Sequence, residues 1–556
     1  MKKNNVSRVF IKGMSVLLAA GMLTACGSGA ASSTGSSSDA TPATAASESA
    51  PAPEADAARK STANTDERYA KVTIALSSDP QDLAPTTLAG DNSKQYIYNN
   101  IYEPLFDFDG GDYTPILAKT YTEVDDTHWQ VQIYDNIYDT AGNQITADDV
   151  VFSVNALVES GNAFKYDIFD SIKKVDDYTV EYTWTTPVTE VGALEWPWCR
   201  TWIVSQKSYE EIGGFADAPI GTGPYKVTEF VSGAHVTLEA NDAYWQTDEL
   251  RDPHHEANVQ TIEYDIIAET SQHVIALGTN QVQYSEYVPA ENLADFQEGG
   301  QYAAQYGVSI TQGSQVNILQ CNTSEGNICN DINFRNAVFY GIDNEAIAAV
   351  TGTCLPCKAF GTPFFSDYYA SWEEGTTYIN TYDPELARQY LEKTAYNGET
   401  LVLEGDSSEV QKSMMTMIQT LLLNIGIKVE ISSKESALVQ TDITNPDAWD
   451  MLIWNIGGGT QIGEWNRPIN YNEFGTGFNM AFLHDETLQT LLTTCATVDG
   501  HTEENMTEMH KYIIDNAYYT ALSMPQINAV YDKSFATLTY RENEFLLPGA
   551  CEYYLD

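Results

Sequence analysis

The sequence predicts a mixed α/β fold with more than one lobe, built from mixed sheets and flanking helices. Its 556 residues are 43% hydrophobic and 19% charged, which is enough apolar material for two or more buried cores. Short alternating strands, such as 71–76 and 128–133, are interleaved with helical stretches. A helix followed by a strand, over 410–432, completes the pattern because such units are typical of α/β lobes.

Three helices are predicted from their start residues and apolar periodicity. The helix over 147–160 follows the capping residue Thr146, and the helix over 383–394 has Pro384 at its first position. The third helix covers about 410–424. We interpret its apolar stripe as core rather than as a methionine surface that faces a ligand; it comprises Met414, Met417, Ile418, Leu421 and Leu422.

A glycine-rich loop after a strand is the first candidate for a ligand site. The strand 427–432 follows the third helix, and the strand 449–454 leads into Asn455-Ile-Gly-Gly-Gly-Thr460. Open α/β sheets bind ligands beyond the carboxyl ends of their strands, so this loop is predicted to form a pocket wall. A plain flexible turn is the alternative.

The charge balance excludes one class of partner. Lys and Arg number 28 against 78 Asp and Glu, a formal net charge of −50. A polyanion of this kind does not hold phosphate backbones, so we expect no nucleic acid partner. We interpret the excess of acidic residues as a heavily hydrated surface that repels other polyanions.

The sequence contains no motif of an enzyme active site. It has no GxSxG elbow, no phosphate-binding loop and no dinucleotide fingerprint, and its eight histidines form no spaced set of metal ligands. We therefore expect no catalysis, no cofactor and no metal centre. A tethered extracellular hydrolase or a surface receptor is the alternative from another class.

The first 25 residues have the pattern of a secretory signal peptide. Basic residues precede an apolar stretch over 14–23, which is too short to span a bilayer of about 30 Å. The stretch ends in Leu23-Thr-Ala-Cys26, which resembles the bacterial lipobox. This resemblance implies that the Cys26 thiol carries a lipid such as palmitate-containing diacylglycerol. An ordinary signal peptide followed by a buried cysteine is the alternative.

Residues 26–68 are predicted to be a disordered tether. They are mainly Ser, Ala, Thr, Gly and Pro without apolar periodicity. About 40 flexible residues reach roughly 35 Å on average, enough to hold a globular body clear of a membrane. The body is therefore expected outside the cytoplasm, anchored to the membrane at the cell surface or the periplasmic face.

Seven further cysteines, an odd number, leave at least one thiol unpaired within the chain. Cys321 and Cys329 flank a turn-like segment. They form either a disulfide that closes this loop or two isolated buried thiols, and the sequence leaves both alternatives open. The motif Cys354-Leu-Pro-Cys357 fits a redox pair, half of a metal site or a short disulfide.

Several phrases, in order along 72–550, resemble the bacterial solute-binding proteins that feed peptide and nickel ABC importers, the family 5 lipoproteins similar to oligopeptide- and dipeptide-binding proteins. They are Ile101-Tyr-Glu-Pro-Leu105, Ile145-Thr-Ala-Asp-Asp-Val-Val-Phe152, Ile220-Gly-Thr-Gly-Pro-Tyr-Lys226, Asn241-Asp-Ala-Tyr-Trp245, Asp331-Ile-Asn-Phe-Arg-Asn-Ala337 and Tyr382-Asp-Pro-Glu385. We interpret Gly221 and Gly223 as supplying unusual backbone dihedrals at a crossing between lobes, and Tyr225 and Trp245 as core.

The resemblance implies a two-lobed fold like that of periplasmic binding proteins, of the large type with an extra domain, in which a hinge lets the lobes close on a ligand. The expected divisions are lobe I over 69–105, 203–287 and 527–556, the extra domain over 106–202, and lobe II over 288–526. Implied partners are a small ligand, a membrane permease and its ATPase subunits, with the chain itself a monomer.

Peptide is the first ligand class that the resemblance implies. Peptide-binding members hold the amino terminus of the peptide with an Asp beyond an aromatic strand end, and here Gly457 or Gly458 takes that position. Glu464 is a candidate replacement carboxylate. An oligosaccharide stacked on tryptophan and a nickel chelate are the alternatives. The candidate ligand-binding residues are Asp91, Asn92, Tyr96, Trp454, Asn455, Gly457, Gly458, Thr460, Glu464 and Trp465.

Overall fold

The computed structural model describes the body of the chain and not its first 58 residues. It describes residues 59–87, 93–109, 112–163, 166, 168–189, 192–247, 250, 252–313, 315–357, 359, 367–373, 381–457, 462, 468–470, 480–541 and 545–555. The predicted signal peptide, Cys26 and most of the tether lie outside these residues. The last part of the predicted tether belongs to the body, because the backbone N–H of Thr62 donates to Tyr553 and that of Leu555 donates to Lys60.

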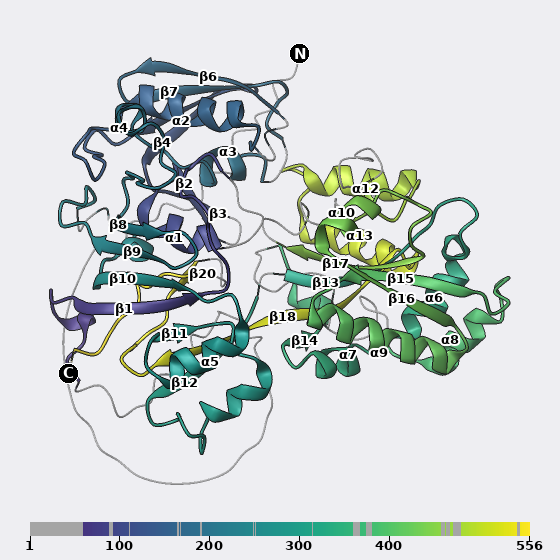
Figure 1. The fold of residues 1–556 in the computed structure, drawn as a ribbon. Helices are drawn as coiled ribbons and strands as arrows, with labels where there is room; N and C mark the ends of the chain where they lie inside the picture. The colour runs from purple at the N-terminus through teal and green to yellow at the C-terminus, as the bar shows by residue number, and fades with distance from the viewer. Residues whose placement is uncertain are drawn as a thin grey trace, which may run out of the picture. The chain divides into compact units, whose positions relative to one another are not determined.

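One large sheet runs through the body, with strand order β16-β15-β17-β13-β18-β11-β1-β10-β9-β8 and with β12 and β14 also paired to β18 (Figure 1). Its strands are β1 Tyr69–Leu76, β8 Tyr225–Val231, β9 His235–Ala240, β10 Val259–Ile266, β11 Tyr284–Ser285, β12 Tyr306–Gln312, β13 Gln315–Cys321, β14 Cys354–Pro356, β15 Thr400–Asp406, β16 Lys428–Lys434, β17 Met451–Gly457 and β18 Tyr519–Asp532. Parallel pairs such as β1–β10 and antiparallel pairs such as β13–β18 confirm the predicted mixed class.

The long strand β18 joins two groups of strands. Its first half pairs with β13 and β14, and its second half pairs with β11 and β12. The strands that come before β12 in sequence lie with the second half, and those that follow it lie with the first. The sheet therefore has two portions that share one continuous strand.

A smaller sheet of order β4-β5-β7-β6 forms beside α2, and two further hairpins are present among the described residues. The bounds are β2 Phe106–Asp109, β3 Asp112–Pro115, β4 Ala118–Asp125, β5 His128–Ile133, β6 Phe169–Asp176, β7 Thr179–Trp184, β19 Tyr540–Arg541 and β20 Phe545–Leu546. Helix α2, Ala147–Ser160, follows the N-cap residue Thr146 as predicted, and a capping box with Asp149 fixes its start.

The remaining helices pack on these sheets. They are α1 Ser93–Ile101, α3 Glu195–Cys199, α4 Gln206–Ile212, α5 Thr270–Gly278, α6 Ile332–Tyr340, α7 Asn344–Thr351, α8 Pro384–Leu391, α9 Glu409–Ile425, α10 Ser436–Asp442, α12 Glu486–Ala496 and α13 Glu503–Asp515; the 3-10 turns are η1 Thr62–Asn64, η2 Pro253–His255, η3 Ala290–Asp295, η4 Ile328–Asn330 and η5 Ala370–Glu373. Helix α9 confirms the third predicted helix and its core stripe, except that Met417 is only partly buried. In the described residues, no helix is both long and apolar enough to cross a membrane.

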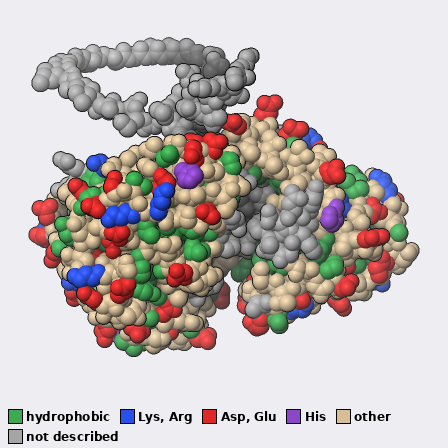
Figure 2. All heavy atoms as spheres, turned by 90° about the horizontal axis from the view of Figure 1, so that it is seen from above, with side chains coloured by type: hydrophobic (Ala, Val, Ile, Leu, Met, Phe, Trp, Pro, Cys, Tyr) green, Lys and Arg blue, Asp and Glu red, His purple; other side chains and the backbone are tan. Residues whose placement is uncertain are grey.

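On the face drawn in Figure 2, acidic side chains are spread out rather than gathered in one patch. Figure 2 shows Asp and Glu scattered over the described face, with Lys and Arg between them. Many of the cations are paired with an acid, as in the contacts of Lys71 with Glu263 and of Arg388 with Glu385. This distribution fits the hydrated acidic surface expected from the composition.

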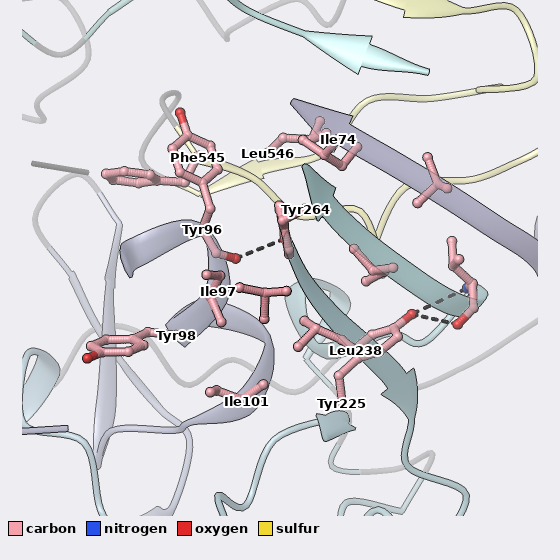
Figure 3. Packing of buried hydrophobic residues seen from close by; sticks show 14 of the residues in the cluster. Ile74, Tyr96, Ile97, Tyr98, Ile101, Tyr225, Leu238, Tyr264, Phe545 and Leu546 are labelled. Carbon is pink, nitrogen blue, oxygen red and sulfur yellow. Dashed lines mark hydrogen bonds between the residues drawn. The ribbon is translucent and has the colours of Figure 1, made fainter. Parts of the chain in front are cut away.

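Separate hydrophobic clusters underlie the parts of the body. One gathers α1, β1, β8–β10 and the C-terminal segment, with Tyr96, Tyr225 and Tyr264 among its members (Figure 3). A second lies under the small sheet and contains Trp129, Trp184, Trp198 and Trp245. Further clusters pack α6–α9 and α12–α13 against the other portion of the large sheet. The domain limits predicted above stay a prediction.

The sequence stretches that resemble the family make contacts that hold the fold together. Neither Gly221 nor Gly223 has a positive φ, so the expected dihedral reason is wrong. The reason is space: a Cβ on Gly221 would lie 1.8 Å from the Ile101 carbonyl oxygen of α1. The Glu103 carboxylate accepts hydrogen bonds from Tyr244 and from the Trp245 indole at 2.7 Å, which joins two phrases distant in sequence.

Candidate ligand-binding site

Three parallel strands bring their carboxyl ends to one edge of the sheet. Strand β15 pairs in parallel with β16 and β17, so Asp406, Lys434 and Gly457 end neighbouring strands. Gly457 is the last residue of β17 and opens the glycine-rich loop. This is the edge at which open α/β sheets bind ligands.

Two predicted ligand residues on β17 lie on opposite faces of the sheet, because successive side chains of a strand alternate. Trp454 pairs with Ile318, and Asn455 pairs with Asn317. The Trp454 ring is half-buried and packs against two hydrophobic clusters. Its indole N–H is buried without a hydrogen-bond partner among the described residues. A ligand cannot contact both side chains from one face.

Half-buried Asn455 begins a row of polar side chains, continued by two buried ones, that was not predicted from the sequence. The Asn455 side-chain Nδ2 donates to the side-chain Oδ1 of Asn317 at 3.4 Å, and the Asn317 side-chain Nδ2 donates to the Ser523 hydroxyl at 3.2 Å. Asn317 and Ser523 have 3% and 0% of their surface exposed. An isolated Asn or Ser in an apolar strand is unremarkable in sequence, so only the pairing of β17, β13 and β18 reveals the row.

The other residues predicted on this loop are not described. Gly457 pairs with Gln315 of β13, whereas Gly458, Thr460, Glu464 and Trp465 lie outside the described residues. The same holds for Asp91 and Asn92 before α1. Their roles stay predictions.

The second candidate edge is formed by β1, β11 and α1. Tyr96 on α1 is buried, and its hydroxyl donates to Glu286, which follows β11 directly. Tyr284, within β11, donates to the other oxygen of Glu286 at 3.2 Å. Strands β1 and β11 are parallel, so Glu286 lies at their carboxyl ends. Figure 3 shows Tyr96 beside Phe545, whose ring centroid is 5.2 Å from that of Tyr96.

The tyrosines near Glu286 are kept neutral by their surroundings. Burial raises the pKa of Tyr284 and of Tyr540, and the negative charge of Glu286 raises that of Tyr540 further. These phenols therefore stay protonated, and the donors to the Glu286 carboxylate are Tyr96 and Tyr284. Phenol donors and one carboxylate can hold an amine, but they supply no nucleophile with its base. Tyr96 was among the predicted ligand-binding residues, whereas Glu286 was not, because only the fold brings it to Tyr96.

The described residues contain no group of three or more His, Cys, Asp or Glu that could hold a metal ion. Cys354 and Cys357 are buried free thiols: Cys354 begins β14, which pairs in extended form with β18, and Cys357 directly follows it. Residues three apart along a strand are separated by about 10 Å, beyond the reach of a disulfide. The structure therefore does not support the predicted Cys354–Cys357 bridge.

Comparisons with known proteins agree with the fold. The model of the family "bacterial extracellular solute-binding proteins, family 5 Middle" matches residues 112–474. The glutathione-binding protein GsiB of Escherichia coli O6:K15:H31 is 24% identical over 381 residues, covering 66% of this chain and 70% of GsiB.

Solved structures with the same two-lobed fold include the ABC transporter substrate-binding protein CtaP of Listeria monocytogenes. It has a TM-score of 0.73 at 18% identity and covers 88% of this chain and 100% of its own. The oligopeptide-binding protein AppA of Bacillus subtilis, solved with a nonapeptide, has a TM-score of 0.67 at 17% identity, covering 88% and 100%. NikA of Brucella suis, solved with Fe(III)-EDTA, has a TM-score of 0.73 at 18% identity, covering 86% and 99%. The chain is therefore a member of the family 5 extracellular solute-binding proteins, which serve ABC importers and are not enzymes.

Proposed function

We propose that this protein captures a short peptide and that Glu286 holds the peptide's amino group. The observation that carries the proposal is the Glu286 carboxylate, bonded by Tyr96 and Tyr284 at the carboxyl ends of β1 and β11. A protonated amine forms strong, charge-assisted hydrogen bonds with a carboxylate. The glutathione and nonapeptide named for two similar proteins support the class of ligand.

The glycine-rich loop has a different role in this proposal. Where peptide-binding relatives are expected to place an Asp, this chain has Gly457 or Gly458, so the amine anchor moves from this portion of the sheet to Glu286. Glu464 remains a second candidate carboxylate. The packing of Trp454 in two hydrophobic clusters leaves its ring less available to stack on a sugar. Peptide is therefore favoured over oligosaccharide.

Membrane attachment belongs to the same proposal. The lipobox-like Leu23-Thr-Ala-Cys26 and the tether support a lipid-anchored monomer that delivers its ligand to a membrane permease with ATPase subunits. A Cys26→Ser variant is expected to leave the membrane fraction, since it has no thiol to acylate. Retention of that variant in washed membranes would contradict the anchor.

The ligand is tested by a thermal-shift screen of residues 59–556 against separate pools of di- to hexapeptides with glutathione, oligosaccharides, and nickel chelates. A ligand at about 100 times its dissociation constant adds roughly 2.7 kcal/mol, or a few degrees in a chain of this size. We expect the peptide pool to raise the melting temperature. A response to the sugar pool alone would overturn the peptide assignment.

Three variants identify the carboxylate. Glu286→Gln is expected to abolish the peptide shift because it removes the charge and keeps the shape. Glu291→Gln, an exposed glutamate nearby, is the matched control and keeps the shift. Loss of the shift in Glu464→Gln with Glu286→Gln unaffected would assign the amine to the glycine-rich loop instead.

A further inference from the structure

Cys321 and Cys329 lie together in the core of the body. Cys321 ends β13 and Cys329 lies in η4, and each has 0% of its surface exposed. Burial and a hydrogen bond with the Cys321 side chain raise the pKa of Cys329 well above its usual value. In the structure both side chains are free thiols that pack in the same hydrophobic cluster.

The turn between them is held at both ends. The Asn322 amide donates to the carbonyl oxygens of Pro446 at 2.8 Å and Trp449 at 2.7 Å, and the Asn327 amide donates to Asp450 at 2.7 Å. The guanidinium of Arg335, itself 5% exposed, donates to the Cys329 carbonyl oxygen at 3.0 Å. These contacts come from two other segments, 446–450 and α6, so the turn has little freedom to move.

We propose that Cys321 and Cys329 form a disulfide in the mature protein. The family works outside the cytoplasm, where disulfides form and persist. Two S–H bonds are lost and one S–S bond forms, while a disulfide oxidant of that compartment accepts two electrons and two protons and becomes two thiols. Because buried protonated thiols react slowly, the bond forms as the chain folds, before the core closes over it.

The bridge would fix one wall of a pocket distinct from the ligand edges. Thr323, Ser324 and Glu325 of the turn line a pocket of about 530 Å³ together with Arg335 and Asp485. The proposal does not depend on the identity of the transported ligand. Its consequence is a rigid turn at this end of β13 whether or not the importer carries peptides.

The other cysteines supply an internal contrast. In the structure Cys321 and Cys329 are free thiols, as are Cys354 and Cys357. The contrast is one of position: Cys321 and Cys329 belong to one hydrophobic cluster, Cys354 and Cys357 are separated along extended backbone, and Cys199 and Cys551 lie in different clusters. The proposal therefore predicts a linked Cys321–Cys329 pair beside an unlinked Cys354 and Cys357 in the same molecule.

The test is peptide mapping of the full chain after export from a bacterial host. Free thiols are alkylated with iodoacetamide under denaturing conditions, and the chain is cut after Glu325, the one acidic residue between the two cysteines. We expect the two resulting peptides to stay joined until a reductant is added, with Cys354 and Cys357 alkylated. Alkylation of both Cys321 and Cys329 in the exported chain would overturn the proposal.

Thermal melting gives a second readout. Reductant is expected to lower the melting temperature of the wild-type protein by about 5 °C, as expected for opening a short loop. The Cys321→Ala/Cys329→Ala variant should melt independently of reductant, whereas the control Cys354→Ala should keep the wild-type response. A melting temperature of the wild-type protein that does not change with reductant would contradict the bridge, and the peptide map decides the question should the double variant not fold.

Discussion

At the scale of single residues, Glu103 shows how a buried carboxyl group links parts of the chain. It has no exposed surface and accepts hydrogen bonds from Tyr244 and Trp245. Burial raises the pKa of Glu103 from about 4.5 to about 7. Between these values the folded protein holds a proton that the unfolded chain has released, so the free energy of unfolding falls as pH rises from 4.5 to 7 and levels off above 7.

Glu103→Gln mimics the protonated carboxyl and is expected to remove this loss. The free energy of unfolding of this variant should exceed that of the wild-type protein by an amount that grows to about 3 kcal/mol between pH 5 and pH 7.5. Urea unfolding at each pH measures this difference. Glu123→Gln, an exposed glutamate in β4, is the control and should follow the wild-type curve. Parallel curves for all three proteins would show that Glu103 does not retain its proton.

At the scale of elements, helix α9 draws its stability from one buried face. Ser408 caps its start by accepting a hydrogen bond from the Gln411 N–H, and Gly426 ends it with φ of 101°. Met414 has 0% of its surface exposed, whereas Leu423 on the same helix has 60% exposed. We expect Met414→Ala to cost about 2–5 kcal/mol of unfolding free energy, because it leaves a cavity among α9, α7 and the sheet.

The matched control on this helix is Leu423→Ala, which should change the stability by less than about 0.5 kcal/mol because its side chain is already in water. Urea unfolding followed by tryptophan fluorescence compares the two variants. Equal losses would mean that helix propensity rather than packing sets the stability of α9.

At the scale of the whole molecule, the net charge of −50 makes the folded state repel itself. Raising the ionic strength from about 10 mM to 150 mM shortens the screening length from roughly 30 Å to 8 Å. We therefore expect the melting temperature to rise over this range. Sodium, potassium and choline chloride should give one common curve, since screening depends on ionic strength alone. A rise with one cation only would instead indicate a specific binding site for that cation.

Sequence by itself determined the elements whose causes are local. The start of α2 at Thr146, the limits of β5 and the buried stripe of α9 were predictable, because capping and periodicity act within a few residues. The ordered family phrases likewise identified the fold and the family, which the comparisons confirm.

Tertiary structure decided which side chains meet. Tyr96 and Glu286 are 190 positions apart, and nothing near either residue in sequence indicates the other. Trp454 and Asn455 are adjacent, yet strand register sends them to opposite faces of the sheet. The need for glycine at 221 likewise comes from α1, which leaves no room for a Cβ. Local forces set the elements, whereas a binding edge depends on contacts between segments that only the complete fold brings together.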